Sequence, residues 1–152
     1  MKMYKNILVP LDGSELAETA LAEAVKLAKL SNADKLVLFT VITIPSILLS
    51  DTAEGLDIMR FKQGQFQKAQ KYLAEVSSRI TPEGINVVPE IMEGVASDLI
   101  VDYSMNHEID VIVIATHGYT GLKKLMLGSV ALSVLHDSPV PVLLIRPAAR
   151  SK

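Results

Sequence analysis

Short apolar runs alternate with segments of helical period along this chain, and this alternation constrains the fold more than any other feature. The apolar runs lie at 7–9, 36–42, 85–90, 111–115 and 140–145, and the helical segments lie at 14–30, 59–80, around 96–103, and at 129–136. The unbroken run at 36–42 is typical of a strand covered on both faces. The repeated order of strand and helix predicts an α/β fold, an open, mainly parallel sheet of five strands with helices on both faces.

The composition limits the classes of protein to which the chain can belong. Its 152 residues predict a single domain over 1–152 that is large enough to bury a core. No apolar run reaches the roughly 18 residues of a membrane-spanning helix, and the N-terminus lacks the apolar region of a signal peptide. The absence of cysteine excludes disulfides, and a formal charge of −2 gives no electrostatic argument for nucleic-acid binding. We therefore expect a cytoplasmic protein that binds neither nucleic acid nor membrane.

The segment ATHGYTGLKKLMLGS at 115–129 joins the fourth apolar run to the last helical segment. It carries Gly118 and Gly128, and Ser129 stands where the helix is expected to begin. Glycines let a backbone approach a ligand closely, and the N–H groups at a helix start attract anions. The segment is therefore either a phosphate-binding loop or a surface loop whose glycines only make turns. Ser129 would bond a phosphate oxygen, cap the helix, or do both.

A second turn is expected to face this loop across a crevice. In a doubly wound sheet, ligands bind beyond the carboxyl ends of the strands where the strand order reverses, and the first and fourth strands are expected to meet there. Asp12, after the first strand, would bind a ribose hydroxyl, although its spacing from Glu15 also fits a capping box. Val41 would present backbone groups to an adenine edge or would simply be a buried strand residue. The convergence of these turns favours a nucleotide site.

Catalytic and metal-binding patterns are weak in this sequence. His117 could reach a ligand from the glycine loop, but no pairing of histidine with carboxylate has metal-ligand spacing. Any metal would arrive as Mg²⁺ on the phosphates of a nucleotide. No Gly-x-Ser-x-Gly elbow and no general base placed for a water are present. We expect no enzymatic activity beyond, at most, slow ATP hydrolysis.

The segment 43–58 has no clear period, and a loop of that length inside a compact domain is usually functional or mobile. It contains the apolar triplet Ile47-Leu48-Leu49. The triplet would be a buried tuck, a lid over a ligand, or a contact with another chain. We expect the buried tuck, and a protein partner at this loop is the alternative.

The last apolar run, 140–145, predicts a dimer. Pro139 and Pro141 flank Val140, and proline within a strand favours an edge position. An uncovered edge carrying apolar side chains is an aggregation hazard, and a two-fold partner is the simplest cover. We expect a homodimer in which residues 140–145 of the two copies meet.

Three passages together resemble the universal stress protein family. They read NILVPLDGSELAETAL, EGVASDLIVDYSMNHEIDVIVIATHG and LGSVALSVLHDSPVPVLLIRP, and the resemblance extends from Tyr4 to Pro147. It implies a parallel, Rossmann-like sheet in the order 3-2-1-4-5 and dimerisation through the last strand. It also implies an adenine-nucleotide-binding regulator or sensor of the stress response.

One branch of the family binds ATP through Gly-x2-Gly-x9-Gly-Ser/Thr, and here the first glycine is Ala115. The resemblance implies that Asp12 and Val41 contact ribose and adenine. It implies further that phosphate is held by Gly118, Gly128, Ser129 and the Val130 amide, and we include Pro10, Ala115 and His117 in the binding site. Alanine at the end of a strand has φ < 0, so the substitution should be allowed unless the ligand packs against its Cα. The alternative function is a protein-interaction module with the same fold and dimer but no nucleotide.

Overall fold

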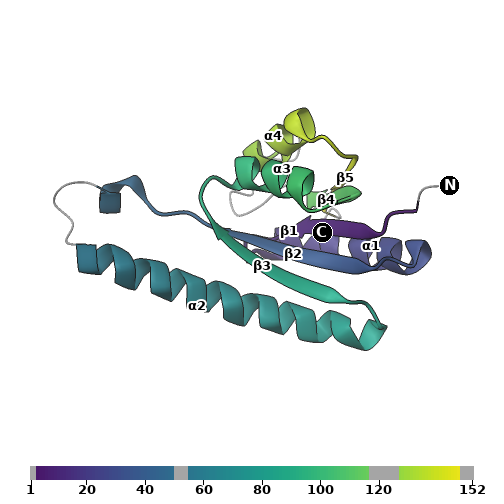
Figure 1. The fold of residues 1–152 in the computed structure, drawn as a ribbon, viewed down its shortest axis with the longest axis horizontal. Helices are drawn as coiled ribbons and strands as arrows, with labels where there is room; N and C mark the ends of the chain where they lie inside the picture. Colours follow the sequence, from purple (N-terminus) through teal and green to yellow (C-terminus); the bar gives the residue numbers. More distant parts are fainter. Residues whose placement is uncertain (1–2, 50–54, 117–126, 148–152) are drawn as a thin grey trace, which may run out of the picture.

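The computed structural model describes residues 3–49, 55–116 and 127–147. Its elements follow one another as strands and helices in alternation (Figure 1). They are β1 (Asn6–Pro10), α1 (Glu15–Ser31), β2 (Lys35–Ile42), the 3₁₀ turn η1 (Ser46–Leu49), α2 (Gly55–Ile80), the 3₁₀ turn η2 (Thr81–Glu83), β3 (Val87–Glu93), α3 (Ala96–Asn106), β4 (Val111–Ala115), α4 (Ser129–Asp137) and β5 (Val142–Ile145).

The strands form one parallel sheet in the order β3-β2-β1-β4-β5, which confirms the expected order. β1 pairs with β2 on one side and with β4 on the other, so the chain reverses its direction of winding between β1 and β4. The carboxyl ends of β1 and β4 therefore lie beside each other. This is the position at which the sequence predicts a ligand crevice.

Two apolar layers sandwich the sheet, because successive side chains of a strand point to opposite faces. In β1, Ile7 and Val9 pack in a cluster with α1 and α2, whereas Leu8 packs in the cluster beneath α3 and α4. All three side chains have no exposed surface. Figure 1 shows α2 along one side of the sheet and the pair α3 and α4 on the other.

Helix α1 begins at a cap that differs from the expected one. The Ser14 hydroxyl accepts a hydrogen bond from the Ala17 N–H at 3.1 Å, so Ser14 is the N-cap and the predicted capping box of Asp12 with Glu15 is wrong. Asp12 instead accepts a bond from the Ser14 N–H at 2.9 Å and fixes the capping residue in place. The helix ends at Ser31, and the C-cap Asn32 has φ of 48°, the left-handed conformation common after a helix.

Several boundaries and one packing prediction also differ from the sequence-based expectation. α2 begins at Gly55 rather than at 59, and β3 spans Val87–Glu93 rather than 85–90. β5 begins after Pro141 rather than at 140, because proline has no N–H to donate to a neighbouring strand. The apolar triplet is not a buried tuck: it lies in η1, where Ile47 is 76% and Leu49 is 63% exposed. These side chains therefore face solvent in this chain.

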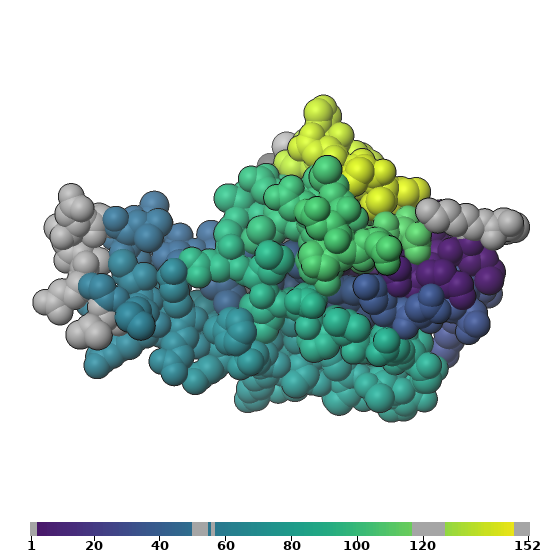
Figure 2. All heavy atoms as spheres, viewed as in Figure 1, coloured from purple at the N-terminus to yellow at the C-terminus, as the bar shows by residue number. Residues whose placement is uncertain are grey.

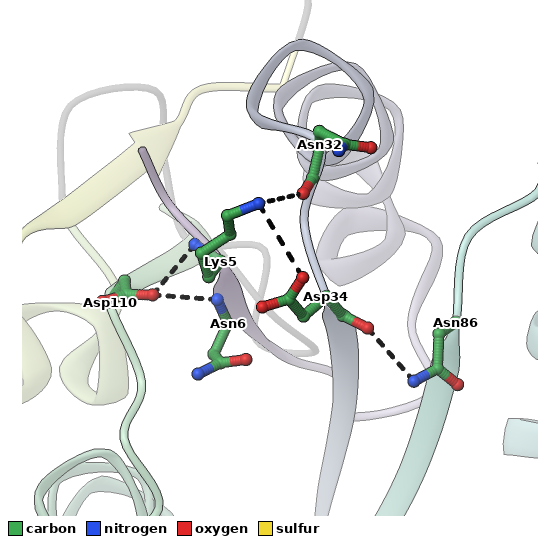
Figure 3. Close-up of polar contacts among 6 residues, drawn as sticks. All are labelled: Lys5, Asn6, Asn32, Asp34, Asn86 and Asp110. Atoms are coloured by element: carbon green, nitrogen blue, oxygen red, sulfur yellow. Dashed lines mark hydrogen bonds and ion pairs between the residues drawn. The ribbon is translucent and has the colours of Figure 1, made fainter. Parts of the chain in front are cut away.

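The amino edge of the sheet is tied together by polar contacts (Figure 3). The Oδ2 atom of Asp110, just before β4, accepts bonds from the backbone N–H groups of Lys5 and Asn6 at 2.9 Å each. The Lys5 ammonium donates to the Asn32 carbonyl at 2.8 Å, and the Asn86 amide donates to the Asp34 carbonyl at 3.1 Å. These bonds link the beginnings of β1, β2, β3 and β4. Separately, none of the helices in the described residues combines the length and apolarity required to cross a bilayer.

Candidate functional site

A cleft of about 240 Å³ opens at the carboxyl ends of β1 and β4. Its wall combines the ends of three strands with the first turns of α1, α3 and α4. The lining residues are Pro10, Leu11, Asp12, Ala17, Phe39, Val41, Ala96, Ile100, Ile114, Ala115, Thr116, Gly128, Ser129, Val130 and Ala131. The structure thus brings together seven of the nine residues predicted for the site. The other two, His117 and Gly118, lie outside the described residues.

The turn after β1 holds Asp12 at the rim of the cleft. Leu11 donates its N–H to the Phe39 carbonyl at 2.8 Å, which fixes the chain where β1 ends. Gly13 has φ of 85°, a conformation that favours glycine and reverses the chain into α1. Asp12 is exposed, and its bond to the Ser14 N–H sets the orientation of its carboxylate. A carboxylate held in this way can accept hydrogen bonds from hydroxyl groups of a ligand.

Alanine suits the backbone at the end of β4, where the ATP-binding pattern has glycine. Ala115 is 6% exposed and is not among the described residues with positive φ, so its backbone conformation suits any residue. It shares the apolar cluster beneath α1 with Ala17, and both small residues line the cleft. The methyl group is therefore accommodated against α1.

Backbone bonds close the base of the glycine loop. Thr116 donates its N–H to the Ile145 carbonyl at 2.9 Å, and Gly128 donates to the Thr116 carbonyl at 2.7 Å. Thr116 and Gly128 are thereby held beside each other at the mouth of the cleft. Thr116 is 8% exposed and lines the cleft, a position that we did not predict.

The start of α4 is open to an anion. Its N-cap is Gly128, and within the described residues no side chain bonds to the cap, so the prediction that Ser129 caps this helix is wrong. The first turn of α4 has no acidic residue, whereas that of α1 has Glu15 and Glu18. The first N–H groups of a helix have no partner inside the helix and carry partial positive charge. Those of Ser129 and Val130 are therefore suited to phosphate oxygens.

The opposite wall of the cleft is apolar. It is made by Phe39 and Val41 of β2 with Ala96 and Ile100 of α3. Phe39 is held by Tyr103, whose ring lies 4.9 Å away at a tilt of 51°. Val41 is half-buried, and β2 continues one residue beyond it to Ile42. A flat apolar group such as a purine fits such a wall.

Sequence reasoning missed three of these wall residues: Phe39, Ala96 and Ile100. Ala96 and Ile100 belong to the apolar stripe that marks α3, and such a stripe does not by itself indicate a ligand. The available signal was position, since Ala96 stands in the first turn of a helix that follows β3 and therefore lies at the carboxyl edge of the sheet.

The charged groups behind the cleft form an ordered cluster between α1 and α2. Glu18 accepts a hydrogen bond from the Arg79 guanidinium at 2.9 Å. Burial, together with the nearby carboxylates of Glu18 and Asp12, raises the pKa of the Tyr72 hydroxyl well above its ordinary value. Tyr72 therefore stays neutral near Asp12. Within the described residues there is no group of three or more histidine, aspartate or glutamate side chains that could hold a metal ion.

Comparison with known proteins gives consistent matches. The universal stress protein family model matches residues 3–146. Universal stress protein MJ0577 from Methanocaldococcus jannaschii is 31% identical over 156 residues, which cover 95% of this chain and 96% of that protein. The solved structure of MJ0577 has a TM-score of 0.83 at 29% identity, over 97% of this chain and 99% of that chain.

Two further solved structures share the fold. Universal stress protein UspA from Lactobacillus plantarum has a TM-score of 0.83 at 27% identity, over 96% of this chain and 100% of that chain. A family protein from Arabidopsis thaliana, solved with AMP bound, has a TM-score of 0.68 at 18% identity, over 95% of this chain and 93% of that chain. The strand order, the near-complete family match and a relative above 30% identity agree. The chain belongs to the universal stress protein family.

Proposed function

We propose that this protein binds ATP, or another adenine nucleotide, in the cleft between β1 and β4 and acts as a homodimeric regulator or sensor in the stress response. The observation that carries the proposal is the uncapped start of α4, which faces the same cleft as Asp12 and an apolar wall. These three features match the phosphate, ribose and base of one nucleotide. Family membership and the AMP-bound relative with this fold support the same class of ligand.

Each part of the nucleotide has proposed partners in the cleft. The N–H groups of Ser129 and Val130, with the Ser129 hydroxyl and Gly128, hold phosphate. Asp12 accepts bonds from the ribose hydroxyls, and the base lies against the apolar wall with its edge at the backbone of Val41. Pro10 and Ala115 complete the floor, and we assign His117 and Gly118 to the phosphate side from the sequence pattern alone.

Mg²⁺ would enter on the β- and γ-phosphates, with its remaining positions filled by water, because it usually binds through phosphates and few protein ligands. The groups that the cleft offers a nucleotide are donors and one carboxylate, which suit binding rather than turnover. We therefore propose a binding role and no catalytic residues.

The dimer is proposed to form through β5. This strand is an edge of the sheet, and Leu143 on it is 40% exposed. α4, which packs beside β5, exposes Leu132 by 54% and Leu135 by 45%. Among the described residues β5 pairs with β4 alone, so a two-fold partner would pair the other side of this strand and cover these leucines.

A second candidate function is a protein-interaction module that binds no nucleotide. The exposed Ile47 and Leu49 in η1 favour it, since apolar side chains gathered on a surface often mark a binding site. The two functions are separated by whether the wild-type protein binds nucleotide at all.

Calorimetric titration with ATP, with and without Mg²⁺, and with AMP tests the proposal. We expect binding of ATP that is weakened in Asp12→Asn, because the amide keeps one oxygen for the Ser14 N–H but loses the carboxylate that a ribose would contact. Asp137→Asn, at an exposed position at the end of α4, is the matched control and should bind as the wild type does. Absence of binding by the folded wild type would reject the proposal in favour of the interaction module.

A further inference from the structure

An arm projects from one end of the molecule, formed by the end of β2, η1 and the N-terminal half of α2 (Figure 1). α2 has 26 residues and is therefore about 39 Å long, so it runs well past the carboxyl ends of the strands. At the tip of the arm, η1 exposes Ile47 by 76% and Leu49 by 63%. We call these two side chains the knob. Figure 2 shows the arm standing out from the body of the molecule.

A groove of about 490 Å³ lies on the same arm, between α2 and the ends of β2 and β3. Its lining residues are Ile42, Lys62, Gln63, Phe66, Gln67, Gln70, Ile91, Met92 and Glu93. Phe66 is 44% and Met92 is 37% exposed. The groove is thus an apolar hollow bordered by amide side chains, and it is larger than the nucleotide cleft.

The charges at the groove match an uncharged occupant. Lys62 and Glu93 form an ion pair at 2.9 Å, so the charges in the lining are neutralised within the chain. The segment 43–49, TIPSILL, carries no charged residue. Burial of an unpaired charge is costly, whereas an uncharged apolar segment enters such a groove without that cost. The knob and the groove are therefore both apolar, and neither brings an unpaired charge to the contact.

The groove is separate from the nucleotide cleft and from the β5 edge. Val41 lines the cleft, and its neighbour Ile42 lines the groove on the opposite face of the sheet. β3 and β5 are the two opposite edges of the sheet. An interface at the groove can therefore form independently of nucleotide binding and of pairing through β5.

We propose that the knob of one copy of this protein inserts into the groove of a second copy, and that the second copy's knob reciprocally fills the first groove. Both features lie on one arm, so a single two-fold axis can bring both pairs together, as in an isologous interface. Reciprocal insertion covers the exposed apolar side chains of both arms. Where the β5 edges also pair, the two interfaces together build an assembly larger than a dimer.

Cross-linking between single-cysteine variants tests the contact directly, because the chain has no cysteine of its own. Ile47→Cys in the knob is mixed with a mass-tagged Gln67→Cys in the groove under mild oxidation. We expect a mixed disulfide dimer that forms faster than in a mixture of Gln67→Cys with Leu30→Cys, whose position is 82% exposed and away from the arm. Equal rates in the two mixtures would overturn the proposal.

The mass of the assembly gives a second test. Ile47→Asp places a charge in the knob and should halve the mass measured by light scattering, and its dissociation midpoint should rise by at least about tenfold in concentration. The matched variant Leu30→Asp should leave the mass of the wild type unchanged. Thermal melts of both variants verify folding. An unchanged mass for folded Ile47→Asp would contradict the proposal, whatever the state of the β5 edge or of nucleotide binding.

Discussion

The amino and the carboxyl ends of the strands, here called the amino edge and the carboxyl edge, differ in how their polar groups are bonded. At the amino edge, backbone N–H and C=O groups before the strands are bonded within the chain, by Asp110, Lys5 and Asn86 (Figure 3). At the carboxyl edge, the start of α4 has no side-chain cap within the described residues, and a cleft lies in front of it. The polar bonds at the amino edge therefore hold the strands together, whereas the N–H groups at the start of α4, on the carboxyl edge, suit a ligand.

Helices α1 and α4 both begin at the carboxyl ends of the strands, and they differ in how their first N–H groups are bonded. α1 has the Ser14 cap and two acidic residues in its first turn. These groups compensate the partial positive charge at the start of this helix. α4 starts from Gly128 without a carboxylate in its first turn. Of these two helices, α4 is therefore the one suited to a phosphate.

Substitution at the amino edge should have the largest effect on stability. Asp110→Ala removes the acceptor of two backbone N–H groups, and we expect the free energy of unfolding to fall by about 2–3 kcal/mol. Denaturant titration measures the change. Asp34→Ala, at the same edge but 70% exposed in its side chain, should cost less than about 1 kcal/mol. A loss of ATP affinity in folded Asp110→Ala would break the division between the two edges.

Proline at the start of α4 should weaken binding without destabilising the fold. Ser129 is the first residue of the helix, where proline is tolerated, and Gly128 before it has the extended conformation that proline requires. Ser129→Pro removes one N–H donor and the hydroxyl, so ATP affinity should fall by about 1.5–3 kcal/mol, or roughly 10- to 150-fold.

Ser129→Ala, which removes the hydroxyl and keeps the N–H, is the control and should lose less affinity. Calorimetry and thermal melts of the same samples separate the two quantities. Unchanged ATP affinity in Ser129→Pro would show that the α4 amides do not hold phosphate.

Removal of the α1 cap should lower both the unfolding free energy and the ATP affinity modestly. Ser14→Ala loses the bond to the Ala17 N–H, and we expect a cost of about 1 kcal/mol in unfolding free energy. Because the Ser14 hydroxyl also donates to the Asp12 carboxylate at 2.5 Å, ATP affinity should fall slightly as well. Ser14→Thr restores both the capping oxygen and the hydroxyl donor to Asp12, and it should recover stability. A variant that loses stability but binds ATP as the wild type does would show that Asp12 needs no support from Ser14.

Substitution of Gly64, which lies away from both edges, should give a small gain in stability. Gly64 lies inside α2, and within the described residues nothing lies within 4 Å of the position that its Cβ would occupy. Gly64→Ala should therefore raise the unfolding free energy by about 0.5–1 kcal/mol and leave ATP affinity unchanged. A fall in stability would mean that another molecule packs closely against α2 at this point.

The α/β class and the location of the cleft could be predicted because they follow from short-range patterns. The apolar runs and their alternation with helical segments define the sheet, and the turn at Asp12 and the glycines mark its carboxyl edge. The full strand order was implied by the resemblance of the sequence to its family, and the structure confirms it. The placement of Asp12 and Val41 at one cleft follows from these features together.

The details that failed depend on contacts between segments distant in sequence or on local competition. Ser14 and Asp12 are both good caps, and the choice between them depends on the turn at Gly13. The exposure of Ile47 could not be inferred, because the sequence of an apolar triplet does not show whether its side chains are buried or exposed. Phe39 and Ile100 line the cleft because β2 and α3 come together there, which no local pattern reveals.

The most direct measurement is an ATP titration followed by the backbone amide signals of ¹⁵N-labelled protein. We predict that the largest shifts occur at Ser129 and Val130, with smaller ones around Asp12 and Val41, and that the amides of Lys5 and Asn6 at the amino edge stay unchanged. Shifts concentrated away from the start of α4, or no shifts at millimolar ATP, would contradict the assignment of the carboxyl edge as the nucleotide site.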